Sequence, residues 1–184
     1  MSQAPDLRRL TTDQLTGGEL SEIRTLLDAA FGQDPDERFT EHDWEHVLPG
    51  THFVVDHDGA IVAFASVAER RIDVGGRPFR TGYVEAVATA PGRQGQGLGT
   101  RVMEAVTAFI TERFELGALG TGAHHFYKRL GWQTWLGRSF VRTADGVEPT
   151  AEEDGYIMVL LTPASRGLDL TEAISCDWRP GDVW

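Results

Sequence analysis

The sequence predicts an α/β fold in which helices flank a mixed, mostly antiparallel β-sheet. Residues 51–89 contain three apolar runs separated by turn signals at 57–59 and 75–76, which is the pattern of an antiparallel meander. The last run carries residues 83–88 into a glycine-rich turn and an apolar pattern of helical period, and another apolar run follows at 116–119. A strand, a helix and a second strand in this order form a right-handed crossover, so we expect these two strands to lie parallel.

Further helices and strands are indicated on both sides of the meander. Thr16 with Glu19, and Thr40 with Asp43, have the spacing of capping boxes, which mark helix starts. The remaining patterns predict a first strand at 7–12, helices at 17–31 and 41–48, a short helix at 124–130, strands at 132–142 and 156–161, an acidic loop at 144–154 and an extended tail from 168.

Length and composition indicate one domain that spans residues 1–184. The chain is 41% hydrophobic, which is enough for one core. Its single cysteine, Cys176, excludes an intrachain disulfide and a cysteine metal site, and we expect it to be a buried apolar residue. His42 and His46 lie four residues apart, but Asp43 stands where a zinc protease has glutamate. We therefore predict no metal site.

The formal net charge is −11, which argues against a nucleic-acid partner and favours a cationic substrate. An acidic surface that serves only solubility is the alternative. The first residues lack the basic and apolar regions of a signal peptide, and no apolar run is long enough to cross a bilayer. We therefore expect a cytoplasmic protein with no membrane partner.

The glycine-rich turn, Gln94-Gly-Gln-Gly-Leu-Gly99, indicates an anion site. Backbone N–H groups at the start of a helix bind phosphates when no side chains cover them. A Walker A loop would need a lysine, which this turn lacks, and a dinucleotide fingerprint would need glycine in place of Thr100. A glycine-rich turn that binds no ligand stays an alternative.

Two motifs resemble those of the GCN5-related N-acetyltransferases. Gln94, Gly97 and Gly99 match the Gln/Arg-x-x-Gly-x-Gly/Ala loop whose amides hold the pyrophosphate of coenzyme A in that family. The run from Ala123 through Phe-Tyr to Gly-Trp132 resembles its second signature. Other segments look like those of the aminoglycoside 2′-N-acetyltransferases, namely 40–46, 82–85, 116–119 and the tail Cys-Asp-Trp-Arg-Pro-Gly-Asp-Val-Trp at 176–184.

The resemblance implies a fold, a reaction and a partner. The fold would be that of the GCN5-related N-acetyltransferases, with a parallel central strand pair that splays apart beside the cofactor. The reaction would be direct transfer of acetyl from acetyl-CoA to the 2′-amino group of an aminoglycoside, giving resistance. Two alternatives stay open: acetylation of another polyamine, a cell-wall precursor or a protein amine, and a non-catalytic module that binds acyl-CoA or a drug. Relatives form dimers, and Trp135, which we expect at the surface, would allow a homodimer.

By the same resemblance, Glu85 and Tyr127 carry the chemistry. Glu85 is the only acid in the central strand and would act as general base through a water, the alternative being an ordinary outward-facing strand residue. Tyr127 would protonate the leaving thiolate, or pack under the pantetheine arm. The matching cofactor contacts are Val87, Ala88, Thr89, Gln94, Gly95, Gln96, Gly97, Leu98 and Gly99.

An acidic acceptor site is implied as well, because an aminoglycoside carries several ammonium groups. The carbonyl of Ala86 would hold the reacting amine, although the family often has glycine at that position. The matching acceptor contacts are Asp43, Glu153 (with Glu152 and Asp154 as competing matches), Asp182 and the carboxylate of Trp184. A further acid could be Asp34, Asp36 or Glu37, and the loop 120–125 is shorter than in relatives, which leaves its acceptor contacts open.

Overall fold

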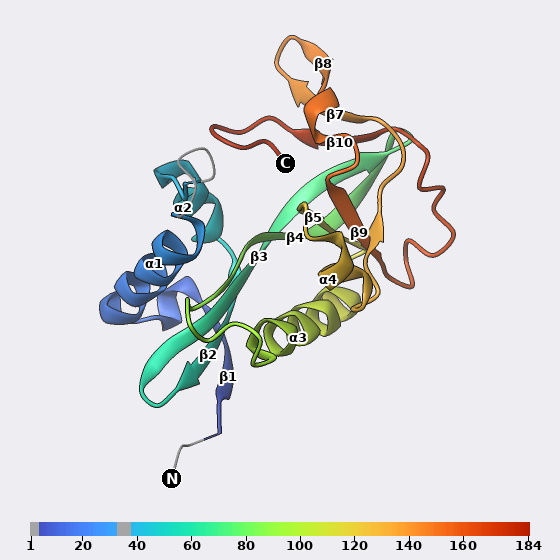
Figure 1. The fold of residues 1–184 in the computed structure, drawn as a ribbon. Helices are drawn as coiled ribbons and strands as arrows, with labels where there is room; N and C mark the ends of the chain where they lie inside the picture. The colour runs from blue at the N-terminus through green and yellow to red at the C-terminus, as the bar shows by residue number, and fades with distance from the viewer. Residues whose placement is uncertain (1–3, 33–37) are drawn as a thin grey trace. The chain divides into compact units, whose positions relative to one another are not determined.

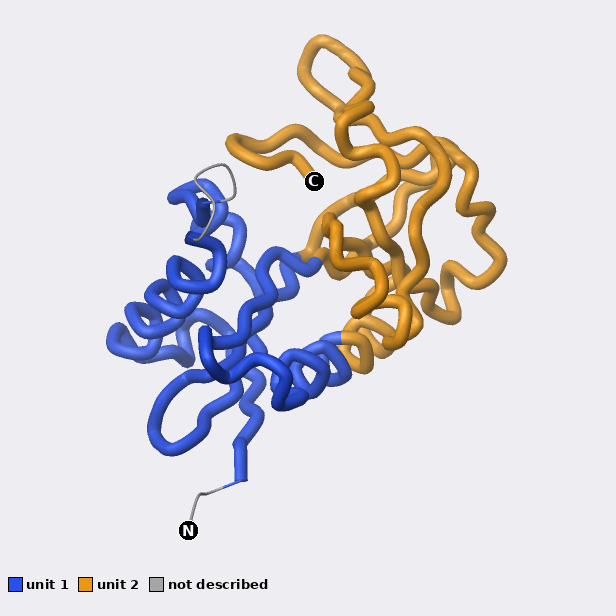
Figure 2. Tube along the Cα trace, viewed as in Figure 1, with its two compact units in different colours: residues 1–68, 84–106 blue, residues 69–83, 107–184 orange. Residues whose placement is uncertain are grey.

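A computed structural model describes residues 4–32 and 38–184, and it divides the chain into two compact units (Figure 2). Unit 1 comprises residues 1–68 and 84–106, and unit 2 comprises 69–83 and 107–184. Three elements run from one unit into the other: β3 (Ala60–Val74), β4 (Arg77–Thr89) and α3 (Leu98–Arg113). Figure 1 shows the order of the elements along the chain.

Unit 1 joins antiparallel strands to two capped helices. β1 (Asp6–Thr11) pairs with β2 (Thr51–His57), which pairs with the first part of β3. The helices are α1 (Gly17–Phe31) and α2 (Glu41–Val47), and both begin at the predicted capping boxes. The apolar face of α1 packs with the strands in one core cluster, whose buried members are Leu15, Ile23, Leu26, Leu27, Val47, Val54, Ile61, Phe64, Ala86 and Ala88.

A buried histidine sits on β2 of unit 1. The His52 side chain is 1% exposed, stacks on Phe64 with a centroid distance of 5.6 Å, and places Nε2 2.7 Å from Thr12 Oγ1. Burial disfavours the imidazolium form and lowers the pKa of His52 to about 4. The ring is therefore neutral at physiological pH.

Unit 2 is built on a sheet with strand order β6-β9-β5-β4-β3-β10-β7-β8. The new strands are β5 (Leu116–Gly120), β6 (Gln133–Thr134), β7 (Ser139–Thr143), β8 (Gly146–Pro149), β9 (Ile157–Leu161) and β10 (Ile174–Asp177). β5–β9, β6–β9, β7–β8 and β10–β3 run antiparallel. β4 and β5 run parallel at residues 81–83 and 116–118, which confirms the crossover prediction.

Two glycines let the end of α3 lie close on these parallel strands. A Cβ placed at Gly82 would lie 2.9 Å from Ile110 and Phe114 side-chain atoms, and one at Gly117 would lie 2.9 Å from the Leu160 Cβ. Contacts below 3.0 Å force a shift of the neighbouring atoms, so both positions need glycine for this packing.

The structure corrects several expectations for residues 124–154. The expected strand 132–142 is two strands, β6 and β7, because the intervening backbone leaves the sheet and donates the N–H groups of Leu136 and Gly137 to Leu170 O. The expected acidic loop contains β8 and a 3-10 helix, η3 (Ala151–Glu153). The short helix α4 covers only His124–Lys128.

The expected surface position of Trp135 is also wrong, because its side chain is buried. Its side chain is 1% exposed and its Nε1–H donates to Glu172 O at 3.0 Å. The large exposed apolar side chains are instead Leu136, Val147, Tyr156 and Trp178. Cys176 is buried as expected, and none of the helices in the described residues is both long and apolar enough to cross a membrane.

Candidate active site

The glycine-rich turn links β4 to α3 in unit 1. Residues 94–97 are exposed, whereas Leu98 is buried at the start of the helix. Gly95 and Gly97 have φ angles of 75° and 77°, a region that side chains with a Cβ rarely adopt. A Cβ added at either position would meet no atom within 4 Å. Backbone shape, and not crowding, therefore requires these glycines, and the space above the turn is open to a ligand.

The end of β4 exposes alternate residues to opposite faces. Ala86 and Ala88 are 4% exposed and belong to the core of unit 1. Glu85, Val87 and Thr89 are half-buried and point to the other face by the two-residue period of a strand. Glu85 is thus a partly buried carboxylate on a rigid strand, as a general base requires.

Asp43 on α2 has a structural partner. Its Oδ2 accepts hydrogen bonds from Thr40 N–H and Thr40 Oγ1–H, both at 2.7 Å. In return its N–H donates to Thr40 Oγ1 at 3.3 Å. One carboxylate oxygen of Asp43 is therefore part of the capping box. Asp34, Asp36 and Glu37 lie outside the described residues.

Tyr127 is a buried phenol on α4 of unit 2. Its side chain is 7% exposed and packs against Phe126 and Trp132, with centroid distances of 4.9 Å and 6.2 Å. Burial disfavours the phenolate and raises the pKa of Tyr127 to about 12. The hydroxyl therefore keeps its proton at physiological pH and can donate a hydrogen bond.

The predicted acceptor acids of unit 2 fall into two kinds. Asp154 is bound by the protein itself, because its Oδ1 accepts from Ser139 N–H and Ser139 Oγ–H, both at 2.8 Å. Glu153 is half-buried, and burial followed by repulsion from Asp182 and Glu152 raises its pKa. The charges of Asp182 and Glu152 therefore act on Glu153, whereas one oxygen of Asp154 is occupied by Ser139.

The tail is held by Arg70, which the sequence analysis did not single out. Arg70 Nη2 donates to Val183 O at 2.7 Å and to Asp177 O at 3.2 Å, and its guanidinium lies 4.6 Å from the centroid of the Tyr83 ring. Cys176 Sγ lies 3.2 Å from Val183 O. Arg70 lies between Glu69 and Arg71 in β3, so no local sequence pattern distinguishes it from its charged neighbours.

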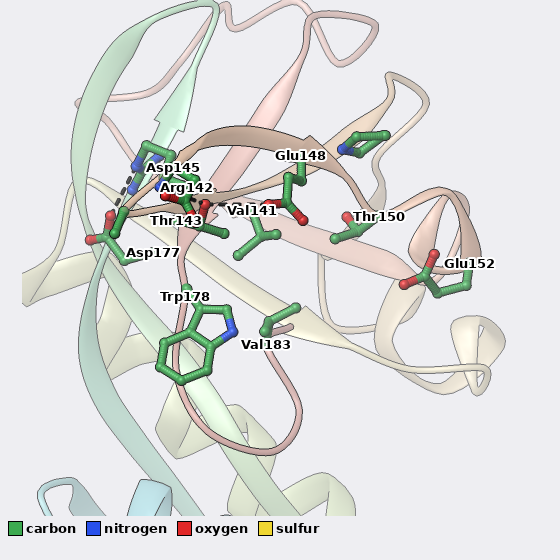
Figure 3. A pocket seen from close by; sticks show the side chains of 12 residues that line it. Val141, Arg142, Thr143, Asp145, Glu148, Thr150, Glu152, Asp177, Trp178 and Val183 are labelled. Atoms are coloured by element: carbon green, nitrogen blue, oxygen red, sulfur yellow. Dashed lines mark hydrogen bonds and ion pairs between the residues drawn. The ribbon is translucent and has the colours of Figure 1, made fainter.

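An acidic pocket opens beside the tail in unit 2 (Figure 3). It has a volume of about 690 Å³, and of the predicted acceptor residues Glu152 lines it. Arg142 is paired with Asp177 at 2.9 Å and with Asp73 at 3.3 Å. The charged and aromatic lining residues, Asp145, Glu148, Glu152, Asp177, Arg142 and Trp178, give a negative pocket that suits a cation.

The predicted residues therefore form two groups. Unit 1 carries Asp43, Glu85, Ala86, the cofactor residues 87–89 and the turn 94–99, and unit 2 carries Tyr127, Glu152, Glu153, Asp182 and Trp184. Among the described residues, no group of three or more His, Cys, Asp or Glu side chains is arranged to hold a metal ion.

Comparison with known proteins gives the family. The model of the acetyltransferase (GNAT) family matches residues 20–132. The aminoglycoside 2′-N-acetyltransferase of Mycolicibacterium fortuitum is 43% identical over 165 residues, which cover 88% of this chain and 83% of that protein.

Solved structures agree on the fold. The GNAT family N-acetyltransferase YhbS from Escherichia coli, solved with CoA, has a TM-score of 0.64 at 16% identity, covering 94% of this chain and 89% of that one. A GCN5-related N-acetyltransferase from Kribbella flavida has a TM-score of 0.57 at 22% identity over 73% of this chain, which spans only 34% of that longer protein. The glycine turn, the parallel strand pair and these matches together establish that the chain belongs to the acetyltransferase (GNAT) family.

Proposed function

We propose that this protein transfers the acetyl group of acetyl-CoA to the 2′-amino group of aminoglycosides and so confers resistance to them. The observation that carries the proposal is the 43% identity to an aminoglycoside 2′-N-acetyltransferase over 88% of the chain. The net charge of −11 and the acidic pocket of unit 2 support a polycationic acceptor.

The glycine turn fits the donor, and acetyl-CoA is the acetyl donor of this family. Backbone N–H groups of residues 94–99 would bind the diphosphate, because glycines with positive φ leave them uncovered. Main-chain groups of Val87, Ala88 and Thr89 would bind the pantetheine arm in the manner of an added strand.

Two side chains, those of Glu85 and Tyr127, would assist the proton transfers of the reaction. The acceptor amine is mostly protonated at neutral pH, so Glu85 would take a proton from it, through a water, before nitrogen bonds to the acetyl carbon. Once the nitrogen–carbon bond has formed, the nitrogen carries one further surplus proton. As the carbon–sulfur bond breaks, this proton would pass through water to the sulfur, so that coenzyme A leaves as a thiol, and Tyr127 would donate a hydrogen bond to the sulfur while its negative charge develops. Because the pKa of Tyr127 is about 12 and that of a thiol about 8.5, a hydrogen bond is favoured over complete proton transfer.

Acceptor recognition would use the Ala86 carbonyl for the reacting amine and carboxylates for the other ammonium groups. Asp43, Glu152, Glu153 and Asp182 are the proposed carboxylates, together with the main chain of Trp184. Charge-assisted hydrogen bonds of this kind fix orientation as well as affinity.

The test compares two acceptors of the kanamycin type that differ only in a 2′-amino or a 2′-hydroxyl group. We expect acetyl-CoA consumption and a product one acetyl group heavier with the amine alone. Equal rates on both acceptors would rule out 2′-transfer and favour another amine.

The Glu85→Gln and Tyr127→Phe variants separate an enzyme from a non-catalytic module. A binding module would take up acetyl-CoA and acceptor with unchanged affinity in both variants and release no coenzyme A even before substitution. An enzyme would bind both ligands and lose turnover.

Three further properties belong to the proposal. The chain would act as one domain, as a homodimer, and in the cytoplasm, where acetyl-CoA is available. The exposed side chains of Leu136, Val147 and Tyr156 offer apolar surface for a second copy. Light scattering coupled to size exclusion gives the mass of the assembly, and a monomer at micromolar concentration would rule the dimer out.

A further inference from the structure

A buried chain of hydroxyl groups joins the tail of unit 2 to the turn that carries the acceptor acids. Trp184 Nε1–H donates to Thr150 Oγ1 at 3.0 Å, and Thr150 Oγ1–H donates to Ser139 Oγ at 2.8 Å. Trp184, Thr150 and Ser139 are 6%, 4% and 1% exposed. We call Trp184, Thr150, Ser139 and Asp154 the relay.

The hydrogen bonds of the relay all run in one direction, from Trp184 to the carboxylate of Asp154. Ser139 Oγ lies 2.8 Å from Thr150 O and 2.8 Å from Asp154 Oδ1, and it has one hydrogen to donate. A carboxylate is a stronger acceptor than a peptide carbonyl, so this hydrogen goes to Asp154. Each hydroxyl then accepts from the previous donor and donates to the next, which strengthens every bond in the chain.

The two ends of the relay lie next to two acids of the proposed acceptor site. Glu153 precedes Asp154, and Asp182 is two residues before Trp184. The negative charge of Asp182 contributes to the raised pKa of Glu153, so the two ionised carboxylates repel each other. Charge alone would move them apart when no acceptor is bound.

We propose that Thr150 and Ser139 are positioning residues, which fix Glu153 against Asp182 so that both carboxylates receive ammonium groups of one polycationic acceptor. The inference rests on the proposed function for the identity of that acceptor. It also explains why Asp154 binds Ser139, while its neighbour Glu153 is left to bind substrate.

Other hydrogen bonds also hold the backbone of the tail, so we expect loss of the relay to affect side-chain positions and not the fold of the tail. Arg70 and Cys176 hold Val183 O, and Arg179 Nε donates to Asp182 O at 2.7 Å. Removal of the Thr150 hydroxyl would therefore keep the tail folded. It would leave the Trp184 indole N–H buried without its partner, a cost that shifts the side chain or the turn.

The experiment compares Thr150→Val, which keeps the shape and removes the hydroxyl, with Thr150→Ser, which keeps the hydroxyl. We expect Thr150→Val to raise the KM of a 2′-amino aminoglycoside about tenfold, with kcat and the KM of acetyl-CoA within about twofold of wild type. Thr150→Ser should restore the acceptor KM. An unchanged acceptor KM in Thr150→Val, or an equal rise for acetyl-CoA, would overturn the proposal.

A double-mutant cycle decides whether the relay acts through the acids. In a Glu153→Gln, Asp182→Asn background, adding Thr150→Val should change the acceptor KM less than about twofold, because the carboxylates it positions are gone. A tenfold rise in that background too would show a general structural defect and overturn the proposal.

Binding of spermine, measured by calorimetry, separates failure of the relay from failure of the proposed function. If the wild-type protein acetylates no aminoglycoside, the proposed function fails. The relay then stands only if Thr150→Val and the Glu153→Gln, Asp182→Asn protein both bind spermine more weakly than wild type. Absence of spermine binding by wild type, or equal affinity in Thr150→Val, overturns the relay as well.

Discussion

The glycine turn and the acidic residues Glu153 and Asp182, which we call the acidic region, would bind ligands by different means. In the turn, six consecutive residues, 94–99, would supply main-chain groups, and the backbone conformations of Gly95 and Gly97 set the shape. In the acidic region, Glu153 and Asp182 are 29 positions apart in the sequence (182 − 153), and the charge of one acts on the other only through the fold. A site made from one stretch of backbone can be identified from its letters, whereas a site made from distant side chains depends on the contacts that hold it.

We expect the largest effect on activity from Glu85, the proposed general base. Glu85→Gln removes the proposed base, so we expect kcat to fall about 10²- to 10⁴-fold, with little change in acetyl-CoA affinity. The rate of the variant should also rise with pH, as the free amine becomes available. Glu104→Gln, on the exposed face of α3, is the control, and steady-state kinetics from pH 6 to 9 make the measurement. A loss below twofold would remove Glu85 from the chemistry.

The glycine turn is tested by a substitution to a residue that cannot adopt the backbone conformation of the glycine it replaces. Gly97→Val places a β-branched side chain at φ 77°, which costs on the order of 1–3 kcal/mol and should raise the Kd of acetyl-CoA by about 10- to 100-fold. Gly59→Val is a matched control, because Gly59 has φ 80° and also meets nothing within 4 Å. Calorimetry should show weakened binding in the first variant only. Equal weakening in both would mean that general destabilisation, and not the turn, is responsible.

In the acidic region, we expect substitution of Glu153 to change the affinity for the acceptor and the stability of the fold in opposite directions. Glu153 has a raised pKa in the folded protein, so the folded state binds more protons than the unfolded state just above the ordinary pKa, and stability falls as the pH rises through that range. At pH 7 the ionised Glu153 is therefore destabilising. Glu153→Gln should raise the Tm and weaken acceptor binding by about five- to tenfold. Thermal melts and acceptor titrations with Glu112→Gln as control check both. A lower Tm would contradict the repulsion.

The smallest effect on activity is expected at His52. A fall in pH lowers the stability of the fold through His52, whereas it raises stability through Glu153. Its pKa is about 4 when folded and about 6.5 when unfolded. Protonation therefore favours the unfolded state, and stability present above pH 6.5 is lost as the pH falls towards 4, by roughly 3 kcal/mol at most. Denaturant melts of His52→Gln should show a shallower loss over this window, and those of His42→Gln, an exposed control, should match wild type. Parallel curves for His52→Gln and wild type would contradict a buried neutral ring.

The sequence predicted the meander, both capping boxes, the α3 helix and the parallel strand at 116–119, because each has a local pattern. The second parallel pair, β10 with β7, was not predicted, since the two strands lie far apart in the sequence with β8, η3 and β9 between them. The break at 135–138 was also missed. It depends on backbone bonds to Leu170 O, which no alternation of apolar and polar residues reveals.

The candidate site likewise has residues with a local sequence pattern and residues whose contacts depend on the fold. Gln94 to Gly99 could be proposed as cofactor contacts from spacing and a glycine pattern, and Glu85 as a base from being an acid in an apolar strand. The choice among Glu152, Glu153 and Asp154 could not be made from the letters. The structure adds that Asp154 Oδ1 accepts from Ser139 Oγ–H, a contact that the sequence did not reveal. Arg70 and Thr150 were missed for the same reason, because their partners are in the tail.

The most direct test of the backbone site is an amide NMR titration of the ¹⁵N-labelled protein with coenzyme A. We expect the N–H resonances of residues 94–99 to move most, with the glycines Gly95 and Gly97 resolved in their own spectral region and Gly59 unmoved. Saturation by coenzyme A with the resonances of 94–99 unchanged, while others shift, would show that this turn does not hold the diphosphate.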